Sequence, residues 1–333
     1  MPARRILVTG GAGYVGSALV PALLERGHTV TVVDVMMVEG VAFPASPALS
    51  VVRGDIRDAP LMERLLRGQD AVIHLAFISN DPEYALDPAL GESINWEAFR
   101  SLTGASRRQG VRRFIFPSSC SVYGRAEAGQ GEGLTEDAPT APLTDYARLK
   151  LRCEQHLRSL AGPDFCPVSL RAATVCGPSP RLRLDLLVNR MAAQAYHQRE
   201  IPLQGAERIR PCLHIQDMVE FYCALLSLPD APLCGQVFNA AFENRTARDT
   251  AELIREELGA DVRIVADAPT RDERSYRVSS RRLHETLGLA PRRGTREAVR
   301  ELKRVFAEGG LPEPWTTARY YNKQTQLRIP LRP

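Results

Sequence analysis

Short apolar runs alternate with stretches of helical periodicity along the first half of the chain. The apolar runs predict strands that are buried on both faces, at residues 6–8, 30–34, 49–53, 71–75 and 114–116. Between them, apolar residues at three- and four-residue spacing predict helices at residues 15–26, 60–66, 90–109 and 146–160. Strands and helices that alternate in this way are typical of an α/β protein with a Rossmann-type, doubly wound parallel sheet.

The alternation weakens after Gly177-Pro178-Ser179-Pro180, whose glycine and prolines mark a boundary. The elements expected around and beyond this point are strands at 167–171 and 236–239 and helices at 181–197, 248–258 and 281–287. We therefore predict a Rossmann domain over residues 1–178, with a segment near 213–242 returning to it. Residues 179–333 are expected to form a smaller, mostly helical C-terminal lobe that binds the substrate.

The composition is ordinary for a globular protein and excludes several classes of partner. Of the 333 residues, 44% are hydrophobic and 25% are charged, and the net charge is +4, so neither nucleic acid nor a membrane is expected as a partner. Seven cysteines without a C-x-x-C pair predict reduced thiols and a cytoplasmic location. The sequence shows no signal peptide, membrane span or metal-site spacing. His74 and His214 end apolar runs and are interpreted as buried structural residues.

A glycine-rich turn, Thr9-Gly10-Gly11-Ala12-Gly13-Tyr14-Val15-Gly16, joins the first predicted strand to the first predicted helix. In a dinucleotide site, glycines allow the tight turn and the close approach of a pyrophosphate, and the helix N-terminus offers N–H groups to it. A turn without a ligand is the alternative, and Asp34 at the end of the second strand argues against it. A carboxylate there accepts hydrogen bonds from a ribose and repels a 2′-phosphate, so we expect NAD rather than NADP.

Tyr146 and Lys150 lie about one helical turn apart on one face of a predicted helix. A nearby cation lowers the pKa of a tyrosine, so that the phenolate can act as a general base towards a sugar hydroxyl. The run Ser118-Ser119-Cys120-Ser121-Val122-Tyr123-Gly124 follows a predicted strand and places hydroxyls at the carboxyl edge of the sheet. Tyr-x-x-x-Lys also occurs on solvated helix faces, but the hydroxyl run favours catalysis. Residues 124–141 are expected to form a mobile loop.

These motifs resemble those of the extended short-chain dehydrogenase/reductase family, and within it the nucleotide-sugar epimerases and dehydratases. The resemblance spans nearly the whole chain. It implies that Ser119, Tyr146 and Lys150 are the catalytic residues and that Asp34 holds the adenosine ribose. It further implies a cofactor site made of Gly10, Gly13, Tyr14, Val15, Gly16, Asp34, Asp55, Ile56, Leu75, Ala76, Asn95, Tyr146 and Lys150.

The same resemblance implies a substrate site in the second half of the chain. Residues 170–178 are similar to the family's L-R-x-x-N-V-Y-G-P stretch, with Thr174 in place of Asn and Cys176 in place of Tyr. Arg210 opens a stretch similar to R-x-F-x-H-V-x-D, whose arginine meets the substrate diphosphate. A later run with three arginines, at 271–277, resembles a second phosphate clamp, although such runs can also be solvated surface charge. The implied substrate contacts are Ser119, Ser121, Tyr146, Thr174, Arg210, Arg271 and Arg274.

The activity that the resemblance implies is that of an NAD-dependent nucleotide-sugar epimerase with a 4-keto intermediate. Tyr146 is expected to be the general base, Ser119 the hydroxyl donor and Lys150 the activator. A 4,6-dehydratase is less favoured, because Cys120 and Ser121 stand where the family's dehydratases carry Asp and Glu. A C4 dehydrogenase or reductase stays open. A non-catalytic NAD-binding protein would be expected to have lost the Ser, Tyr and Lys set.

The resemblance also suggests a homodimer. The predicted helices 90–109 and 146–160 would pair with their copies in a four-helix interface, to which Leu149, Leu157 and Leu160 could supply apolar contacts.

Overall fold

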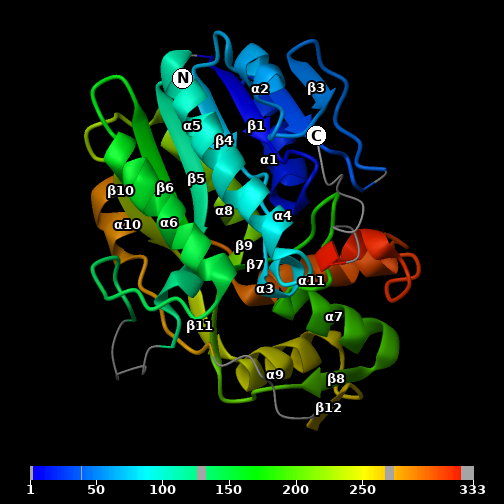
Figure 1. The fold of residues 1–333 in the computed structure, drawn as a ribbon. Helices are drawn as coiled ribbons and strands as arrows, with labels where there is room; N and C mark the ends of the chain where they lie inside the picture. The colour runs from blue at the N-terminus through cyan, green and yellow to red at the C-terminus, as the bar shows by residue number, and fades with distance from the viewer. Residues whose placement is uncertain (1–2, 39, 126–132, 267–273, 324–333) are drawn as a thin grey trace.

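A seven-stranded parallel sheet forms the centre of the computed structural model, which describes residues 3–38, 40–125, 133–266 and 274–323 (Figure 1). The strand order is β10-β6-β5-β4-β1-β2-β3, and every neighbouring pair is parallel. The strands are β1 (Arg5–Thr9), β2 (Thr29–Asp34), β3 (Leu49–Arg53), β4 (Ala71–His74), β5 (Arg113–Ser119), β6 (Cys166–Ala172) and β10 (Gln236–Ala240). This order confirms the predicted doubly wound fold, whose ligands bind where the strand order reverses beside β1.

Helices cover both faces of this sheet, because most of its strands are apolar on both sides. One apolar core lies under α1 (Tyr14–Glu25), α8 (Ile215–Ser227) and α10 (Arg281–Leu287), and the other lies under α2 (Ala59–Leu66), α5 (Phe99–Arg108) and α6 (Asp145–Leu160). The short elements around them are α3 (Asp81–Tyr84), α4 (Pro88–Glu92), the π-helix η1 (Ser93–Ala98) and the 3₁₀ turn η2 (Cys120–Tyr123). The predicted helix 90–109 is therefore divided among α4, η1 and α5.

A lobe below the sheet in Figure 1 is built from α7 (Leu187–Gln198), α9 (Ala247–Leu258) and α11 (Thr295–Ala307), which pack against one another. Two small sheets accompany these helices. One pairs β8 (Glu200–Leu203) with β12 (Arg263–Ala266), and the other has the order β11 (Glu243–Thr246), β9 (Ile209–His214) and β7 (Thr174–Cys176). The 3₁₀ turn η3 (Ala318–Tyr320) follows. The sequence pattern missed β7, β8, β9, α8, β11, β12 and α11.

The predicted helix 181–197 is wrong at its start, since α7 begins only at Leu187. The preceding residues alternate between polar and apolar, which is the period of an extended segment rather than of a helix. Leu182 and Leu184 are buried in an apolar cluster with α7 and α11, while Arg181, Arg183 and Asp185 line a cavity.

Two leucines of α6 also lie differently from the expectation. Leu149 and Leu157 are buried in the core of their own chain, where they pack beneath the sheet with residues of α2 and α5. They are therefore not available as contacts between two copies. Leu160 is partly buried against the same core.

The described residues contain no helix with the length and apolar character that a membrane crossing requires. All seven cysteines are free thiols, and six of them are buried.

Candidate active site

A cavity of about 890 Å³ opens at the carboxyl ends of the parallel strands, and residues of the lobe complete its wall. It brings together all but two of the residues predicted to form the site, namely Gly10, Gly13, Tyr14, Val15, Gly16, Asp34, Asp55, Ile56, Leu75, Ala76, Ser119, Ser121, Tyr146, Lys150, Thr174, Arg210 and Arg274. The exceptions are Asn95, which does not line the cavity, and Arg271, which lies outside the described residues.

In the glycine-rich turn, backbone atoms approach two of the glycines so closely that a Cβ atom would not fit. Gly10 has φ +71°, and a Cβ there would lie 2.5 Å from the backbone nitrogen of Ala76. A Cβ on Gly16 would lie 2.5 Å from the carbonyl oxygen of Gly11. Helix α1 begins directly after the turn, and its N-cap Gly13 offers no side-chain cap. The first N–H groups of the helix are therefore left for an anion, as a dinucleotide site requires.

Two carboxylates are held in fixed orientations where β2 and β3 end. Asp34 accepts a hydrogen bond from the Ala12 N–H at 3.0 Å and another from the Met36 N–H at 2.8 Å. Burial raises the pKa of Asp34, and these two bonds act against that rise. Asp55 forms an ion pair with Arg57 at 2.7 Å. The turn and both carboxylates thus have the donors, acceptors and space that an adenosine diphosphate moiety needs.

Ser119, Tyr146 and Lys150 meet in the wall of the same cavity. Ser119 ends β5, and its Oγ accepts a hydrogen bond from the Ser121 N–H at 3.1 Å. Tyr146 and Lys150 stand in the first turns of α6, whose N-cap Thr144 accepts from the Ala147 N–H at 3.3 Å. The Ser119 hydroxyl lies near the Tyr146 hydroxyl, whose pKa it lowers. Since Ser119 Oγ already accepts from the backbone, its own proton is available for the tyrosine oxygen.

Several neighbouring groups act on the pKa of Tyr146. Burial raises this pKa, and Asp81 raises it further, whereas Arg183, the Ser119 hydroxyl and Arg274 lower it. The Lys150 ammonium donates to the Pro117 carbonyl at 2.7 Å, and it lies 3.5 Å from the centre of the Phe77 ring and 5.7 Å from that of the Tyr146 ring. Burial lowers the pKa of Lys150 to about 7.

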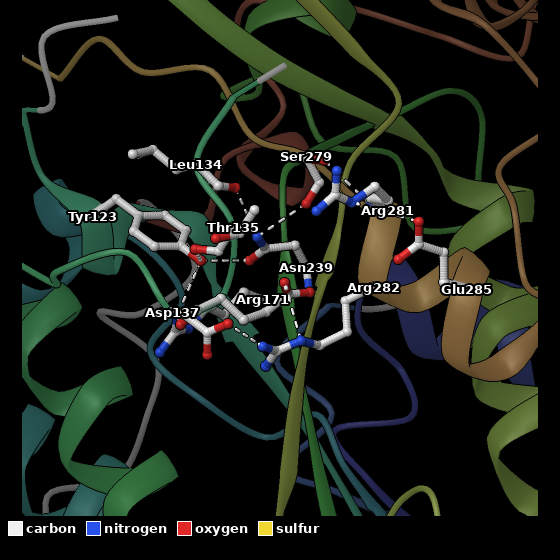
Figure 2. Close-up of polar contacts among 11 residues, drawn as sticks. Tyr123, Leu134, Thr135, Asp137, Arg171, Asn239, Ser279, Arg281, Arg282 and Glu285 are labelled. Carbon is white, nitrogen blue, oxygen red and sulfur yellow. Dashed lines mark hydrogen bonds and ion pairs between the residues drawn. The ribbon is translucent and has the colours of Figure 1, made fainter. Parts of the chain in front are cut away.

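A buried polar network supports the catalytic side chains from behind. Glu154, one turn beyond Lys150 on α6, forms an ion pair with Arg171 of β6 at 2.8 Å and also accepts from the Ser118 hydroxyl of β5. Arg171 donates to the Tyr123 hydroxyl at 2.9 Å, and Tyr123 in turn donates to Asn239 of β10 at 2.7 Å, as Figure 2 shows. These bonds tie α6 to three neighbouring strands and so hold Tyr146 in register with Ser119.

Charged residues line this cavity, and of these the sequence analysis identified Arg210 and Arg274 but not Asp81, Arg183 or Asp185. Arg183 pairs with Asp185 at 2.9 Å, and Arg274 pairs with Asp81 at 2.8 Å. The Arg210 guanidinium donates to the backbone carbonyl of Arg274, so these two arginines lie together. The alternation of residues 181–185 was the signal that could have identified part of this set.

Several buried polar atoms of the cavity wall have no hydrogen-bond partner among the described residues. They are Asp81 Oδ1, Ser121 Oγ, Arg181 Nη1, Arg208 Nη1 and Tyr222 Oη. Because buried polar groups in proteins are normally paired, such atoms indicate a cavity built for a polar ligand.

Asn95, which was expected at the cofactor, forms hydrogen bonds with the backbone in this structure. It is fully buried in η1, where its amide accepts from the Ile78 N–H at 2.8 Å and donates to the Ile78 carbonyl at 3.1 Å. Its hydrogen bonds are therefore directed to the loop after β4 and away from the cavity. π-helical turns of this kind often occur beside functional sites.

Neither His74 nor His214 lines the cavity. His74 Nδ1 lies 2.8 Å from Thr9 Oγ1, and burial lowers its pKa to about 3. His214 caps α8 by accepting from the Gln216 N–H at 3.1 Å. Both histidines thus have structural roles. Within the described ranges, no group of three or more His, Cys, Asp or Glu residues is arranged to hold a metal ion.

The sequence and the structure of this chain are similar to those of known proteins. Residues 6–241 match the Epimerase family, described as the NAD dependent epimerase/dehydratase family. The chain is 30% identical to the UDP-glucose 4-epimerase of Azospirillum brasilense, over 92% of this chain and 95% of that protein. It is 32% identical to the dTDP-glucose 4,6-dehydratase of Streptomyces griseus, over 86% of this chain and 89% of that protein. The solved structure of MoeE5 in complex with UDP-glucuronic acid and NAD is similar with a TM-score of 0.79 and 25% identity, over 92% of this chain and 99% of that one.

Proposed function

The chain belongs to the NAD-dependent epimerase/dehydratase family, and we propose that it epimerises a nucleotide-activated sugar through a 4-keto intermediate. The observation that carries the proposal is that Ser119, Tyr146 and Lys150 line one cavity together with the glycine-rich turn. A base and a hydroxyl donor are thereby placed together at the edge of the sheet where the cofactor would lie.

The cradle at the N-terminus of α1 fits NAD, because Gly10 and Gly16 leave no room for a Cβ and Asp34 is fixed beside them. When bound, NAD supplies a hydride acceptor that can return the hydride. Tyr146 takes the proton from the sugar hydroxyl, and Ser119 donates a hydrogen bond to the oxygen as it becomes a carbonyl. Since burial raises the pKa of Tyr146, the positive charges of Arg183 and Arg274 are needed to favour the phenolate.

The substrate class follows from the arginines and from the unpaired polar atoms. Arg210 and Arg274 are brought together in the wall and provide guanidinium groups for a diphosphate. Asp81 Oδ1, Ser121 Oγ and Tyr222 Oη are available to the hydroxyl groups of a sugar. The names of the related proteins, UDP-glucose 4-epimerase and dTDP-glucose 4,6-dehydratase, agree with a nucleotide sugar.

This chain has Cys120 and Ser121 at the two positions where the family's dehydratases carry carboxylates. These residues favour epimerisation over dehydration. Cys120 donates to the Arg171 carbonyl at 3.0 Å, points away from the cavity and has a pKa raised by burial. Ser121 lines the cavity, but it is a neutral hydroxyl. Neither residue supplies the acid and base that loss of water from the sugar requires.

A product assay tests this function. The purified protein is incubated with NAD and a panel of UDP-, GDP-, ADP- and dTDP-sugars, and the products are separated and weighed by mass spectrometry. We expect a product of unchanged mass with a different retention time, and no accumulation of NADH. A product that has lost water identifies a dehydratase. A product that has lost two hydrogens, with NADH formed, identifies a dehydrogenase. Either result contradicts the proposal, and Tyr146→Phe is the control for background conversion.

We also propose that the protein is a cytoplasmic homodimer. The free cysteines suit a reducing compartment. With Leu149 and Leu157 buried in their own chain, we expect the contact to use the outer sides of η1, α5 and α6, and Arg152 of α6 lies 3.6 Å from the centre of the Trp96 ring of η1. Light scattering at micromolar concentration is expected to give twice the chain mass, and a monomer mass contradicts this proposal.

A further inference from the structure

Arg181 is a buried arginine without an ion pair in the wall of the cavity. Arg181 is only 4% exposed, and none of the described residues forms a hydrogen bond with its Nη1 atom. No carboxylate among the described residues forms an ion pair with it, whereas Arg183 and Arg274 each have one. Burial and the neighbouring Arg183 and Arg319 lower its pKa to about 10, against the opposing effect of Asp185 and Glu83.

The backbone around Arg181 is attached to the first turn of α1. The Arg181 N–H donates to Ser17 Oγ at 3.2 Å, and the Ser179 hydroxyl donates to the Tyr14 carbonyl at 2.6 Å. The Tyr14 hydroxyl donates to the Gly177 carbonyl at 2.7 Å. Three bonds therefore hold this segment against the helix end at which the glycine-rich turn lies.

The surroundings indicate which anion Arg181 would meet. The N-terminus of α1 has no side-chain cap, and its first residues, Tyr14, Val15 and Gly16, line the same cavity as Arg181. The charge of Arg181 also reaches Asp34, whose pKa it lowers. An anion that lies between Asp34 and the catalytic residues is the pyrophosphate of a dinucleotide whose adenosine ribose is held by Asp34.

We propose that Arg181 binds the pyrophosphate of NAD and supplies, from the lobe side, the positive charge that the glycine-rich turn lacks. A buried cation without a partner is unfavourable, and a bound pyrophosphate would remove that cost. The segment Gly177–Arg181 would then couple cofactor binding to the lobe. This inference concerns the cofactor alone, so it can fail while the proposed epimerase function holds.

The test measures ligand binding rather than turnover. Arg181→Met removes the charge and keeps an apolar chain of similar length. Titration calorimetry is expected to show that the dissociation constants of NAD and ADP-ribose both rise by about tenfold to a hundredfold, the effect of losing one charge-assisted hydrogen bond. The affinity for adenosine should not change, because adenosine lacks the pyrophosphate. Without ligands, thermal unfolding of the variant should occur at the same or a higher temperature.

Arg26→Met is the matched control, since Arg26 follows the other end of α1 and forms an ion pair with Glu220 at 2.8 Å. It should leave all the dissociation constants unchanged. Arg181→Lys is a second variant that keeps the charge, and we expect it to fold and to lose less ADP-ribose affinity than Arg181→Met.

Three outcomes overturn the proposal. The first is unchanged ADP-ribose affinity in a folded Arg181→Met protein. The second is an equal loss for adenosine and ADP-ribose, which would indicate a general disturbance of the site. The third, from a further titration with UDP, is a loss of affinity for UDP alone, which would assign the arginine to the substrate diphosphate. If Arg181→Met does not fold, Arg181→Gln, which is polar but uncharged, takes its place, and full ADP-ribose affinity in that variant overturns the proposal.

Discussion

Lys150 should make the stability of this protein depend on pH in a way that can be measured. Its ammonium is buried between the Pro117 carbonyl and the Phe77 ring, and burial lowers its pKa from 10.5 to about 7. Between these two pH values the unfolded chain holds a proton at this site that the folded chain has released. The free energy of unfolding therefore rises with pH across this window. Below pH 7 both states are charged, and the whole cost of burying the ammonium is present.

The change in the free energy of unfolding depends on the pH interval between the two pKa values of Lys150. Each pH unit within it changes the free energy of unfolding by about 1.4 kcal/mol, so the interval from pH 7 to pH 9.5 contributes about 3 kcal/mol. Lys150→Met removes the titrating group but keeps a long side chain that can pack against the rings of Phe77 and Phe116. Between pH 7 and pH 9.5, the free energy of unfolding of the variant should exceed that of the wild type by the largest margin at pH 7. This margin should be about 3 kcal/mol smaller at pH 9.5.

Urea denaturation of the protein without ligands, at several pH values, is the suitable assay. Other titrating groups are shared by both proteins, so they cancel in the difference between the two curves. Lys303→Met is the control, because Lys303 is exposed on α11, and its curve should run parallel to that of the wild type. Parallel curves for Lys150→Met and the wild type would refute the argument, since they would mean that the Lys150 ammonium remains charged at no cost in the folded protein.

Four further substitutions, at three residues, test individual roles. Tyr146→Phe should keep the fold and the NAD affinity but lower turnover at least about a hundredfold, and near-normal turnover would reject Tyr146 as the base. Asp34→Ala should weaken NAD binding and narrow its advantage over NADP in titration calorimetry, and an unchanged preference would mean that another acid holds the ribose. Arg210→Lys should raise KM, and Arg210→Ala should cost about 2 to 3 kcal/mol in kcat/KM. NAD affinity should hardly change in either Arg210 variant, and a loss confined to NAD would contradict the diphosphate role.

Much of the fold and part of the site could be predicted from the sequence, because they depend on local properties of the chain. Apolar runs separated by helical periodicity are enough to indicate a parallel sheet that is covered on both faces, and the structure has that sheet. The glycines of residues 10–16 are required by the tightness of a single turn, and the i, i+4 spacing of Tyr146 and Lys150 places them on one helix face wherever the helix lies. These features are encoded within a few residues of one another.

The tertiary structure alone decided which environment each polar or apolar side chain faces. Asn95 belongs to the expected helical region but turns its amide to Ile78, and Leu149 packs inward although it could equally have served an interface. Residues 181–185 were assigned to a helix, yet their alternation places two arginines in the cavity and two leucines in a core. Whether a side chain meets water, a core or a ligand depends on segments distant in sequence packing around it. For that reason the unpaired charge of Arg181 could not have been inferred from its neighbours in the chain.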